Sequence, residues 1–362
     1  MLLSLFCGCG GLDLGFEQAG FSTSLAFDLR KDAVKSWSEN LVTEGKAYVR
    51  DVSKLSLSEL DTLHGARFAP SGVIGGPPCQ SFSRANHFRS DDDPRSDLVR
   101  SFIDLALRLN RHRDPLKFIV LENVLELERA RDGKLLDGQE KRLKKAGFKV
   151  FRLRLNAVNY SVPQKRKRLF VVAIREGLLS NTTFHAPARH AKPKTVRDAI
   201  SGLGTPVFFK DWTAEIPMPI HPNHWCMTPQ SKKFFNGSLQ EGKSGTRSFK
   251  TLAWDAPSIT VSYGHREVHV HPNCDRRLSI YEALLLQGFP RNFWLHGTLS
   301  SQIDQVSEAV PPPLAAAVAN SVRKVTEEPC RVIQKKPAKN SPTAGQAHAT
   351  QQRNTPLPEA TA

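Results

Sequence analysis

The sequence predicts an α/β protein built on a doubly wound sheet with helices on both faces. Short apolar runs of strand length alternate with amphipathic stretches over the first half of the chain, and this alternation is typical of such a sheet. From about residue 177 to residue 255 the sequence changes to Pro, His, Lys, Gly and aromatic residues with weak periodicity. We therefore expect a sheet domain and a second, smaller and irregular domain.

The apolar runs place the individual elements. Residues 1–6 are apolar and stop at a glycine-rich turn, after which Leu12, Phe16 and Ala19 follow a helical period, so a strand, a tight turn and a helix are predicted. Further strands are predicted at residues 23–27, 72–74, 117–121, 149–155 and 169–174. Helices are predicted at residues 98–109, 278–286 and 314–325.

These patterns divide the chain into four segments. The sheet domain is expected to span residues 1–176 and the irregular domain residues 177–275. Residues 276–326 regain helical spacing and are expected to rejoin the first domain. Residues 327–362, rich in Pro, Ala, Thr, Gln and Lys, cannot bury enough apolar surface to fold, which predicts a disordered tail.

The composition restricts the class of protein and its partners. Among 362 residues, 51 Lys and Arg against 35 Asp and Glu give a net charge of +16, which favours a polyanionic partner; a solvated basic surface is the alternative. No apolar run approaches the roughly 20 residues that cross a bilayer. The first residues lack the basic leader of a secretory signal, so an intracellular protein is expected. The six cysteines are spaced too irregularly for a disulfide framework, which leaves a chemical role open for at least one.

The turn Gly8-Cys9-Gly10-Gly11 lies between a strand and a helix, where backbone can approach a ligand closely. Asp28 follows Gly10 by 18 residues, and this spacing suits a carboxylate that binds ribose hydroxyls. Asp13 stands where the third glycine of a dinucleotide fingerprint belongs. A nucleoside cofactor without a pyrophosphate, such as S-adenosylmethionine, would need only the glycines and the acid. The alternative is a plain tight turn.

A thiol follows the predicted strand at residues 72–74, on a loop stiffened by Pro77 and Pro78. In open parallel sheets, ligands bind at the carboxyl ends of the strands. A buried cysteine is commonly just a small hydrophobe, but a Gly-Gly-Pro-Pro loop is a poor place to bury one. Cys79 is therefore predicted to be a nucleophile that acts as its thiolate.

Acidic and basic side chains are expected at the same edge. Glu122 ends an apolar strand, and burial would raise its pKa enough for it to donate to a ring nitrogen. A helix-capping acid is the alternative. Gln164, Arg166 and Arg168 precede the last of the predicted strands and alternate onto one face. Arginine at every second position suits recognition of an oxygen or a phosphate, although a basic run is usually a solvated face.

The blocks in this order resemble those of the C5-cytosine DNA methyltransferases. They extend from residue 4 to about residue 322, and the complete set is far more specific than any one block. The matching blocks are Phe6-x-Gly8-x-Gly10-Gly11, Pro77-Pro78-Cys79-Gln80, Glu122-Asn123-Val124, Gln164-x-Arg166-x-Arg168, Arg276-Arg277-Leu278-Ser279-Ile280-Tyr281-Glu282-Ala283, Gln287-Gly288-Phe289-Pro290 and Ala309-Val310-Pro311-Pro312. The resemblance implies a Rossmann-like methyltransferase sheet with a smaller target-recognition domain.

The resemblance also implies a cofactor and its site. The cofactor would be S-adenosylmethionine, with S-adenosylhomocysteine as product and no metal. Asp28 would bind the ribose and Asp51 the adenine amino group. The complete set of implied cofactor-binding residues is Phe6, Gly8, Gly10, Gly11, Asp28, Asp51, Pro78, Leu98 and Ala309.

The implied catalytic set is Cys79, Glu122, Gln164, Arg166 and Arg168. By resemblance, Cys79 would attack C6 of a cytosine, Glu122 would protonate or hydrogen-bond N3 and the exocyclic amine, and Arg168 would contact O2. Attack at C6 makes C5 nucleophilic enough to accept the methyl group, and loss of the C5 proton then expels the thiol. The target base must leave the stack to reach the thiol, so base flipping is implied.

Two positions depart from the family pattern. Ser307-Glu308 replaces Gly-Asn before the final Ala-Val-Pro, and Arg95-Ser96 replaces Arg-Gly in an earlier block. Both departures bear on cofactor affinity. Cys79 and Glu122 are intact, so activity is expected.

The irregular domain corresponds in position to the target-recognition region of the family. Its basic loops would contact phosphates while a few side chains read base edges. A zinc site is the alternative, because the region carries two groups of possible ligands, His221, His224 and Cys226, and His269, His271 and Cys274. Their spacings fit no structural zinc pattern.

The expected function is transfer of a methyl group from S-adenosylmethionine to C5 of a flipped cytosine in a short duplex sequence. The expected partners are double-stranded DNA and, acting separately, a cognate restriction endonuclease. A monomer in the prokaryotic cytoplasm is expected, associated with the nucleoid through DNA and not with a membrane. The early position of Phe6 leaves no room for a regulatory extension, which favours a compact modification enzyme. Two alternatives remain, the same chemistry on RNA and a catalytically silent DNA-binding protein.

Overall fold

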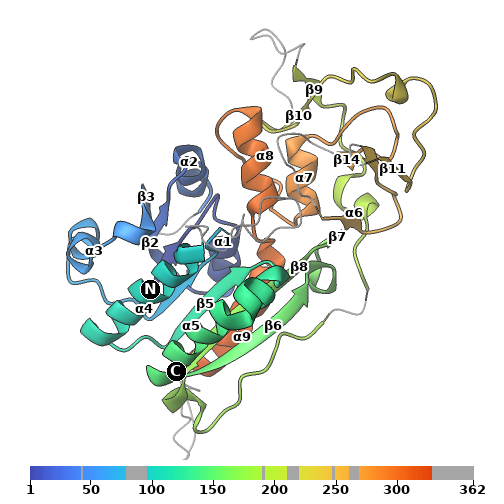
Figure 1. Cartoon of the computed structure of the whole chain (residues 1–362). Coiled ribbons are helices and arrows are strands. Elements are labelled where there is room, and N and C mark those ends of the chain that lie inside the picture. The colour runs from blue at the N-terminus through green and yellow to red at the C-terminus, as the bar shows by residue number, and fades with distance from the viewer. Residues whose placement is uncertain are drawn as a thin grey trace, which may run out of the picture. The chain divides into compact units, whose positions relative to one another are not determined.

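The computed structural model describes residues 1–41, 44–78, 96–189, 192–209, 220–246, 249–260 and 269–327. Its centre is a seven-stranded sheet with the strand order β3-β2-β1-β4-β5-β8-β6 (Figure 1). The strands are β1 (Leu2–Leu5), β2 (Thr23–Asp28), β3 (Lys46–Val49), β4 (Gly72–Gly75), β5 (Phe118–Asn123), β6 (Phe148–Asn156) and β8 (Lys167–Arg175). Every predicted strand lies in this sheet, whereas β3 was not predicted.

The direction in which the sheet is wound reverses between β1 and β4. The pairings from β3 through β5 are parallel, and β8 runs antiparallel to both of its neighbours, β5 and β6. In doubly wound sheets such a reversal opens a crevice at the carboxyl ends of the two central strands. The glycine turn follows β1 and the Pro77-Pro78 loop follows β4, so both candidate ligand loops leave the sheet at this point.

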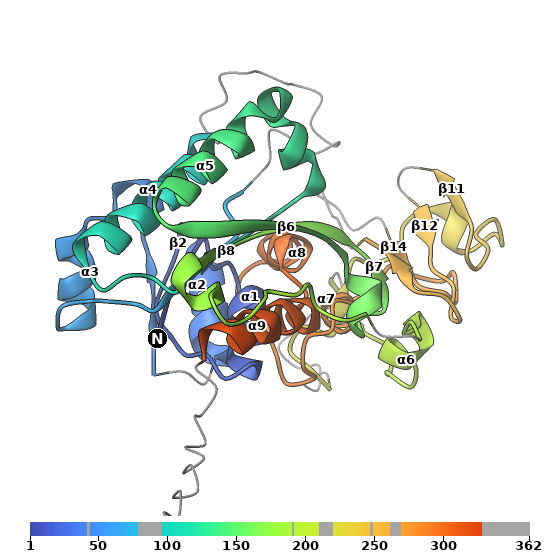
Figure 2. The same ribbon diagram turned by 90° about the horizontal axis from the view of Figure 1, so that it is seen from below.

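Helices cover both faces of the sheet, which confirms the predicted fold class. α4 (Ser96–His112) and α5 (Lys134–Lys145) lie on one face, and α1 (Gly11–Gln18) and α9 (Pro312–Thr326) lie on the other (Figure 2). Because side chains alternate along a strand, Leu3 of β1 packs under α4 and α5 while Leu2 packs under α1 and α9. α1 and α9 meet at Gly15, where a Cβ would lie 2.3 Å from that of Ala315, so this helix pair requires glycine there.

Of the remaining helices, the one predicted at residues 278–286 is present as α7 (Ile280–Leu286), and the others were not predicted. α3 (Leu57–His64) adds Leu60 to the core beneath α4 and α5. A separate core cluster joins α2 (Lys31–Asn40) to α7 (Ile280–Leu286) and α8 (Leu299–Glu308). α5 was missed because its few apolar residues stand among Lys and Arg, although three of its leucines are buried. The short 3₁₀ helices are η1 (Val52–Lys54), η2 (Leu125–Gly133), η3 (Ala157–Tyr160), η4 (Glu176–Leu179) and η6 (Lys232–Phe234).

The region after β8 is irregular, as predicted. Among the residues that the structure describes between β8 and α7, the one α-helix is α6 (Val196–Ile200), and the strands are very short. These strands are β9 (Val207–Phe208), β10 (Trp225–Cys226), β11 (Ser244–Thr246), β12 (Phe249–Thr251), β13 (Ser258–Ile259) and β14 (His269–Val270). β13 pairs with β7 (Gln164–Lys165), which ties this region to the segment that leads into β8.

The predicted boundaries at residues 176, 275 and 326 stay predictions. Nearly all of the predicted tail, residues 328–362, lies outside the described residues. Within the described part of the chain, no helix combines the length and the hydrophobicity needed to cross a membrane.

Candidate active site

The glycine turn after β1 has an unusual backbone. Gly8 and Gly10 adopt φ angles of 55° and 93°, and Phe6, which is not glycine, adopts 54°. The amide of Gly10 donates to the carbonyl of Cys7 at 2.9 Å, which closes the turn. A non-glycine residue at positive φ is strained and is often found at functional sites. Beside Gly8 there is open space, since a Cβ there would meet only Arg30, at 4.0 Å.

Asp28, at the end of β2, supports this turn. One of its carboxylate oxygens accepts from the amide of Gly8 and the other from the amide of Arg30, both at 2.9 Å. Each oxygen keeps further acceptor capacity, because a carboxylate oxygen has two lone pairs. The side chain is thus positioned by the backbone and can still accept hydrogen bonds from a ligand.

The chain returns to the turn at the start of α9. A Cβ on Gly11 would lie 2.3 Å from the carbonyl oxygen of Val310, so this close approach requires glycine. Ala309, which ends α8, is partly buried in the same core cluster as Cys7 and Cys9. The blocks at the two ends of the sequence therefore form one site.

An ion pair that the sequence analysis missed lies at this junction. Nη1 of Arg30 is 2.7 Å from Oε2 of Glu308, and Nε of Arg30 is 3.6 Å from Oδ1 of Asp28. Burial lowers the pKa of Arg30, but the charges of Glu308 and Asp28 outweigh it, so the pKa is raised. The departure from the family pattern at Glu308 is thus matched by a cation from the other end of the chain.

The other implied cofactor residues lie further along the same edge. Asp51 caps η1 and accepts from the amide and the hydroxyl of Ser53, and the hydroxyl bond is the main reason that the pKa of Asp51 is lowered. Leu98 is half-buried in α4. Leu29, which the sequence analysis did not select, is 65% exposed beside Asp28. The sequence does carry a signal for Leu29, because it is a large apolar residue directly after the acid that ends β2.

The loop after β4 is held against the end of β5. The side-chain amide of Asn123 donates to the carbonyl of Pro77 at 2.9 Å. A Cβ on Gly76 would lie 3.2 Å from Oε2 of Glu122, so the backbone of this loop and the carboxylate are in close proximity. Half-buried Pro78 is the last described residue before the gap. Cys79, two residues after Pro77, lies outside the described residues, as does Arg95.

Glu122 is a buried acid with an incomplete set of partners. It is 7% exposed, and Nε of Arg168 lies 3.0 Å from its Oε1. This contact is an ion pair without a well-directed hydrogen bond, and Oε1 makes no other hydrogen bond in the described part of the structure. Burial raises the pKa of Glu122, and the charges of Arg168 and Arg166 oppose that rise only in part. The carboxyl group can therefore be protonated at a higher pH than an exposed glutamate.

The basic run before β8 alternates in exposure as predicted. Gln164 and Arg166 are fully buried and Arg168 is half-buried, whereas Lys165 and Lys167 are exposed. Nη2 of Arg166 donates to the carbonyl of Ser307 at 2.8 Å. Burial is the main cause of the strongly lowered pKa of Arg166, and Arg168 adds to it. The structure brings Arg166 and Arg168 together with Glu122, and it connects them through Ser307 to the glycine turn.

The histidines considered as zinc ligands have other surroundings. His221 stacks on Tyr281 at 3.9 Å, and burial lowers its pKa to about 4. The ring nitrogens of His224 contact the hydroxyl of Ser279 and the carbonyl of Gly204. The residues that the structure describes include no group of three His, Cys, Asp or Glu side chains that could hold a metal ion. The zinc alternative therefore has no support in them.

The chain is similar to known proteins over most of its length. The family model described as C-5 cytosine-specific DNA methylase matches residues 1–324. The chain is 31% identical to Type II methyltransferase M.FnuDI of Fusobacterium nucleatum, over 89% of this chain and 94% of that protein. It is also 31% identical to Type II methyltransferase M.MthTI of Methanothermobacter thermautotrophicus, over 90% and 98% of the two chains.

A solved structure has a similar fold. It is described as a DNA modification methyltransferase encoded within an E. coli prophage, and it aligns with a TM-score of 0.74 at 22% identity, over 90% of this chain and 98% of that one. The family match covers the sheet, the glycine turn, Glu122 and the returning helix α9. The chain therefore belongs to the C-5 cytosine-specific DNA methylases and is a DNA cytosine-5 methyltransferase.

Proposed function

We propose that this enzyme methylates a cytosine that has been flipped out of duplex DNA, through a transient bond between Cys79 and C6 of the base. The observation that carries the proposal is Glu122, a buried carboxyl group with a raised pKa and unused hydrogen-bonding capacity. It lies against the loop that leads into Cys79. An acid in that position can hold a proton at N3 while a thiolate adds to the ring.

In the proposed reaction, each bond that forms is matched by a bond that breaks. The Cys79 thiolate forms a bond to C6, and the electron pair displaced from the ring is accommodated as Glu122 gives its proton to N3. C5, now an enamine carbon, would take the methyl group as the bond from that group to the sulfonium sulfur breaks, which leaves S-adenosylhomocysteine. A base then removes the C5 proton, the bond between C6 and sulfur breaks, and N3 returns its proton to Glu122. Arg168 and Arg166 would orient the base and favour the ionised form of Glu122 once its proton is on N3, and Gln164, which is also buried, would complete the set.

S-adenosylmethionine fits the crevice at the switch between β1 and β4. When bound, it supplies an electrophilic methyl group on a sulfonium. The open space at Gly8 admits a ligand against the backbone, and Asp28 offers acceptors for ribose hydroxyls. Exposed Leu29 provides an apolar surface for an adenine ring. In this proposal Phe6, Gly10, Gly11, Asp51, Pro78, Leu98 and Ala309 complete the site.

The biological setting is part of the same proposal. The relatives above are named Type II methyltransferases, from a bacterium and a methanogen. We infer a prokaryotic modification enzyme that acts as a monomer in the cytoplasm on double-stranded DNA, alongside a separate cognate endonuclease. The irregular region at residues 177–275 would choose the sequence by contacts to base edges.

Covalent trapping tests the mechanism directly. Duplex DNA containing 5-fluorocytosine should form an adduct with the wild-type enzyme in the presence of S-adenosylmethionine, because fluorine cannot leave as the C5 proton does. Cys79→Ser should form no adduct while still binding the duplex. If the wild-type protein methylates normal DNA but never traps, the covalent route is wrong.

A second assay separates the alternative substrates. Labelled S-adenosylmethionine is incubated with duplex DNA and, in parallel, with transfer RNA. We expect label in the duplex alone. Label in RNA alone would overturn the choice of substrate, and label in neither would favour a catalytically silent DNA-binding protein.

A further inference from the structure

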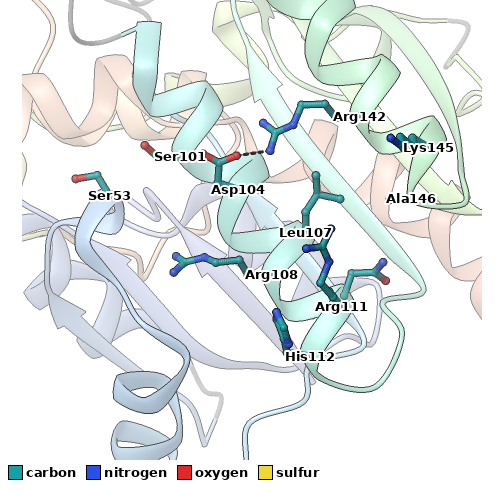
Figure 3. A pocket seen from close by; sticks show the side chains of 11 residues that line it. Ser53, Ser101, Asp104, Leu107, Arg108, Arg111, His112, Arg142, Lys145 and Ala146 are labelled. Carbon is teal, nitrogen blue, oxygen red and sulfur yellow. Dashed lines mark hydrogen bonds and ion pairs between the residues drawn. The ribbon is translucent and has the colours of Figure 1, made fainter.

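A concave, basic surface lies on the sheet face that carries α4 and α5 (Figure 3), and one end of it, at Ser53, adjoins Asp51 of the candidate cofactor site. It is a cavity of about 880 Å³ between η1, the outward side of α4 and the last turns of α5. We call it the α4–α5 groove. It is lined by Ser53, Ser101, Asp104, Leu107, Arg108, Asn110, Arg111, His112, Arg142, Lys145 and Ala146.

The groove carries an excess of positive charge. Four of its lining residues are Arg or Lys, whereas Asp104 is its one acid. Asp104 already pairs with Arg142, as Figure 3 shows. The acids Asp137 and Glu140 of α5 both pair with Arg152 of β6 and do not balance the groove. These acids therefore do not neutralise the positive charges of Arg108, Arg111 and Lys145.

The three cations are accessible and line the same groove from two helices. Arg108 and Arg111 are three residues apart on α4, which places them on the same side of the helix, and Lys145 faces them from α5. All three are exposed. Every residue that lines the groove is exposed or half-buried, so an anion bound here keeps contact with water. Such contacts suit a row of exchangeable phosphates better than one tightly held anion.

The groove leads away from the catalytic edge. Glu122 stands near the carboxyl end of β5, whereas α4 ends at His112, shortly before β5 begins at Phe118. α5 likewise ends at Lys145, shortly before β6 begins at Phe148. The cations therefore lie toward the amino ends of these strands, roughly 20 Å along a six-residue strand from the catalytic edge.

We propose that the α4–α5 groove binds the phosphate backbone of a second stretch of duplex DNA, outside the stretch that carries the target cytosine. The proposal accepts that DNA is the substrate but does not depend on the covalent mechanism. Its contacts involve phosphates alone, so they add affinity for any sequence and strengthen retention on long DNA. A short duplex held at the active site is too stiff to bend back into the groove, because bending DNA over so few base pairs is costly, whereas a longer duplex bends at a lower cost.

Binding measurements on the cofactor-free full chain test the proposal. The test variant is Arg111→Gln/Lys145→Gln. The matched control is Arg323→Gln/Lys324→Gln, which removes one Arg and one Lys from the exposed surface of α9 on the opposite face of the sheet. Fluorescence anisotropy measures the affinity for duplexes of about 15 and about 60 base pairs over a range of salt concentrations.

We expect the test variant to lose about tenfold in affinity for the long duplex, with a salt dependence weakened by about two phosphate contacts. Its affinity for the short duplex and its methylation of that duplex should equal those of the wild type. The control should behave as the wild type on both duplexes.

Three results would overturn the proposal. Equal losses in test and control variants would show a general effect of net charge. Equal losses on short and long duplexes would place the groove on the path of the target DNA. Displacement of the long duplex from the groove by millimolar inorganic phosphate at constant ionic strength would indicate a site for a small anion.

Discussion

Two buried carboxylates in this protein lie beside arginines, yet their surroundings shift their pKa values in opposite directions. Glu282, in the first turn of α7, is fully buried and accepts two hydrogen bonds from Arg276, at 2.9 and 2.8 Å, and one from the amide of Ser279. These bonds outweigh burial, so the pKa of Glu282 is lowered. At Glu122 burial outweighs the single ion pair with Arg168, and the pKa is raised.

The comparison separates a structural pair from a functional one. Glu282 uses its acceptors on Arg276 and on the capping box of α7, and it thereby fixes the junction between β14 and that helix. Glu122 stands at the end of a strand, and its Oε1 accepts no hydrogen bond from the residues that the structure describes. Leaving a buried polar group without a complete set of hydrogen bonds costs free energy. Such a group therefore indicates a position where a ligand would complete the hydrogen bonding.

The largest expected effect is on catalysis at Glu122. Glu122→Gln removes the proton donor and should lower single-turnover methyl transfer by about 10²–10⁴-fold. Because the folded protein disfavours the ionised carboxylate, the variant should unfold at the same temperature as the wild type or higher at neutral pH. A large fall in the unfolding temperature with transfer intact would reverse the assignment of the two pairs.

The reciprocal substitution acts on stability. Glu282→Gln leaves Arg276 buried without its counter-charge and should cost about 3 kcal/mol of unfolding free energy. Urea unfolding measures this cost. Methyl transfer per folded molecule should stay within about twofold of the wild type, since a structural pair contributes nothing to the barrier. A selective loss of turnover with unchanged stability would contradict the comparison.

The pH dependence of stability should differ in sign between the two acids. The folded-state pKa of Glu282 lies below 4.5, so its contribution is present above that pH and is lost as the pH falls. The folded-state pKa of Glu122 lies above 4.5, so its contribution is present at low pH and is lost as the pH rises. Unfolding free energies of both Gln variants, measured between about pH 4 and pH 8, should therefore lie nearest the wild type at low pH, where Gln resembles the protonated acid, and diverge from it as the pH rises, with Glu282→Gln less stable and Glu122→Gln more stable than the wild type. Parallel curves would show that neither pair behaves as described.

The smallest expected effect concerns the ion pair between Arg30 and Glu308. Both side chains are more than a third exposed, so solvent screens their attraction. Glu308→Gln should weaken S-adenosylhomocysteine binding by about twofold to fivefold, measured by calorimetry. Arg30→Gln/Glu308→Gln should be no worse than the single variant, because the two side chains act as a pair. Additive losses would show that they act separately.

Local sequence was sufficient to predict six of the seven strands of the central sheet, the glycine turn and the alternation of Gln164, Arg166 and Arg168. These depend on residues close together in the chain, such as the apolar run before Glu122. Sequence did not identify Leu29 or the partnership of Arg30 with Glu308. Selecting Leu29 from among the other apolar residues takes the exposed fraction of its side chain, which the structure provides. The ion pair joins residues from opposite ends of the folded chain.

The sequence by itself determined the alternating elements, the glycines required by positive φ and close approach, and the family motifs, because these are set by local sterics and by residue order. Only the tertiary structure decided which buried carboxylate is satisfied and which has unused capacity. A pKa in the interior depends on the balance between lost hydration and the hydrogen bonds donated by other segments. Glu122 and Glu282 are the same residue type beside the same partner type, and their different folded surroundings alone set the opposite directions of their pKa shifts.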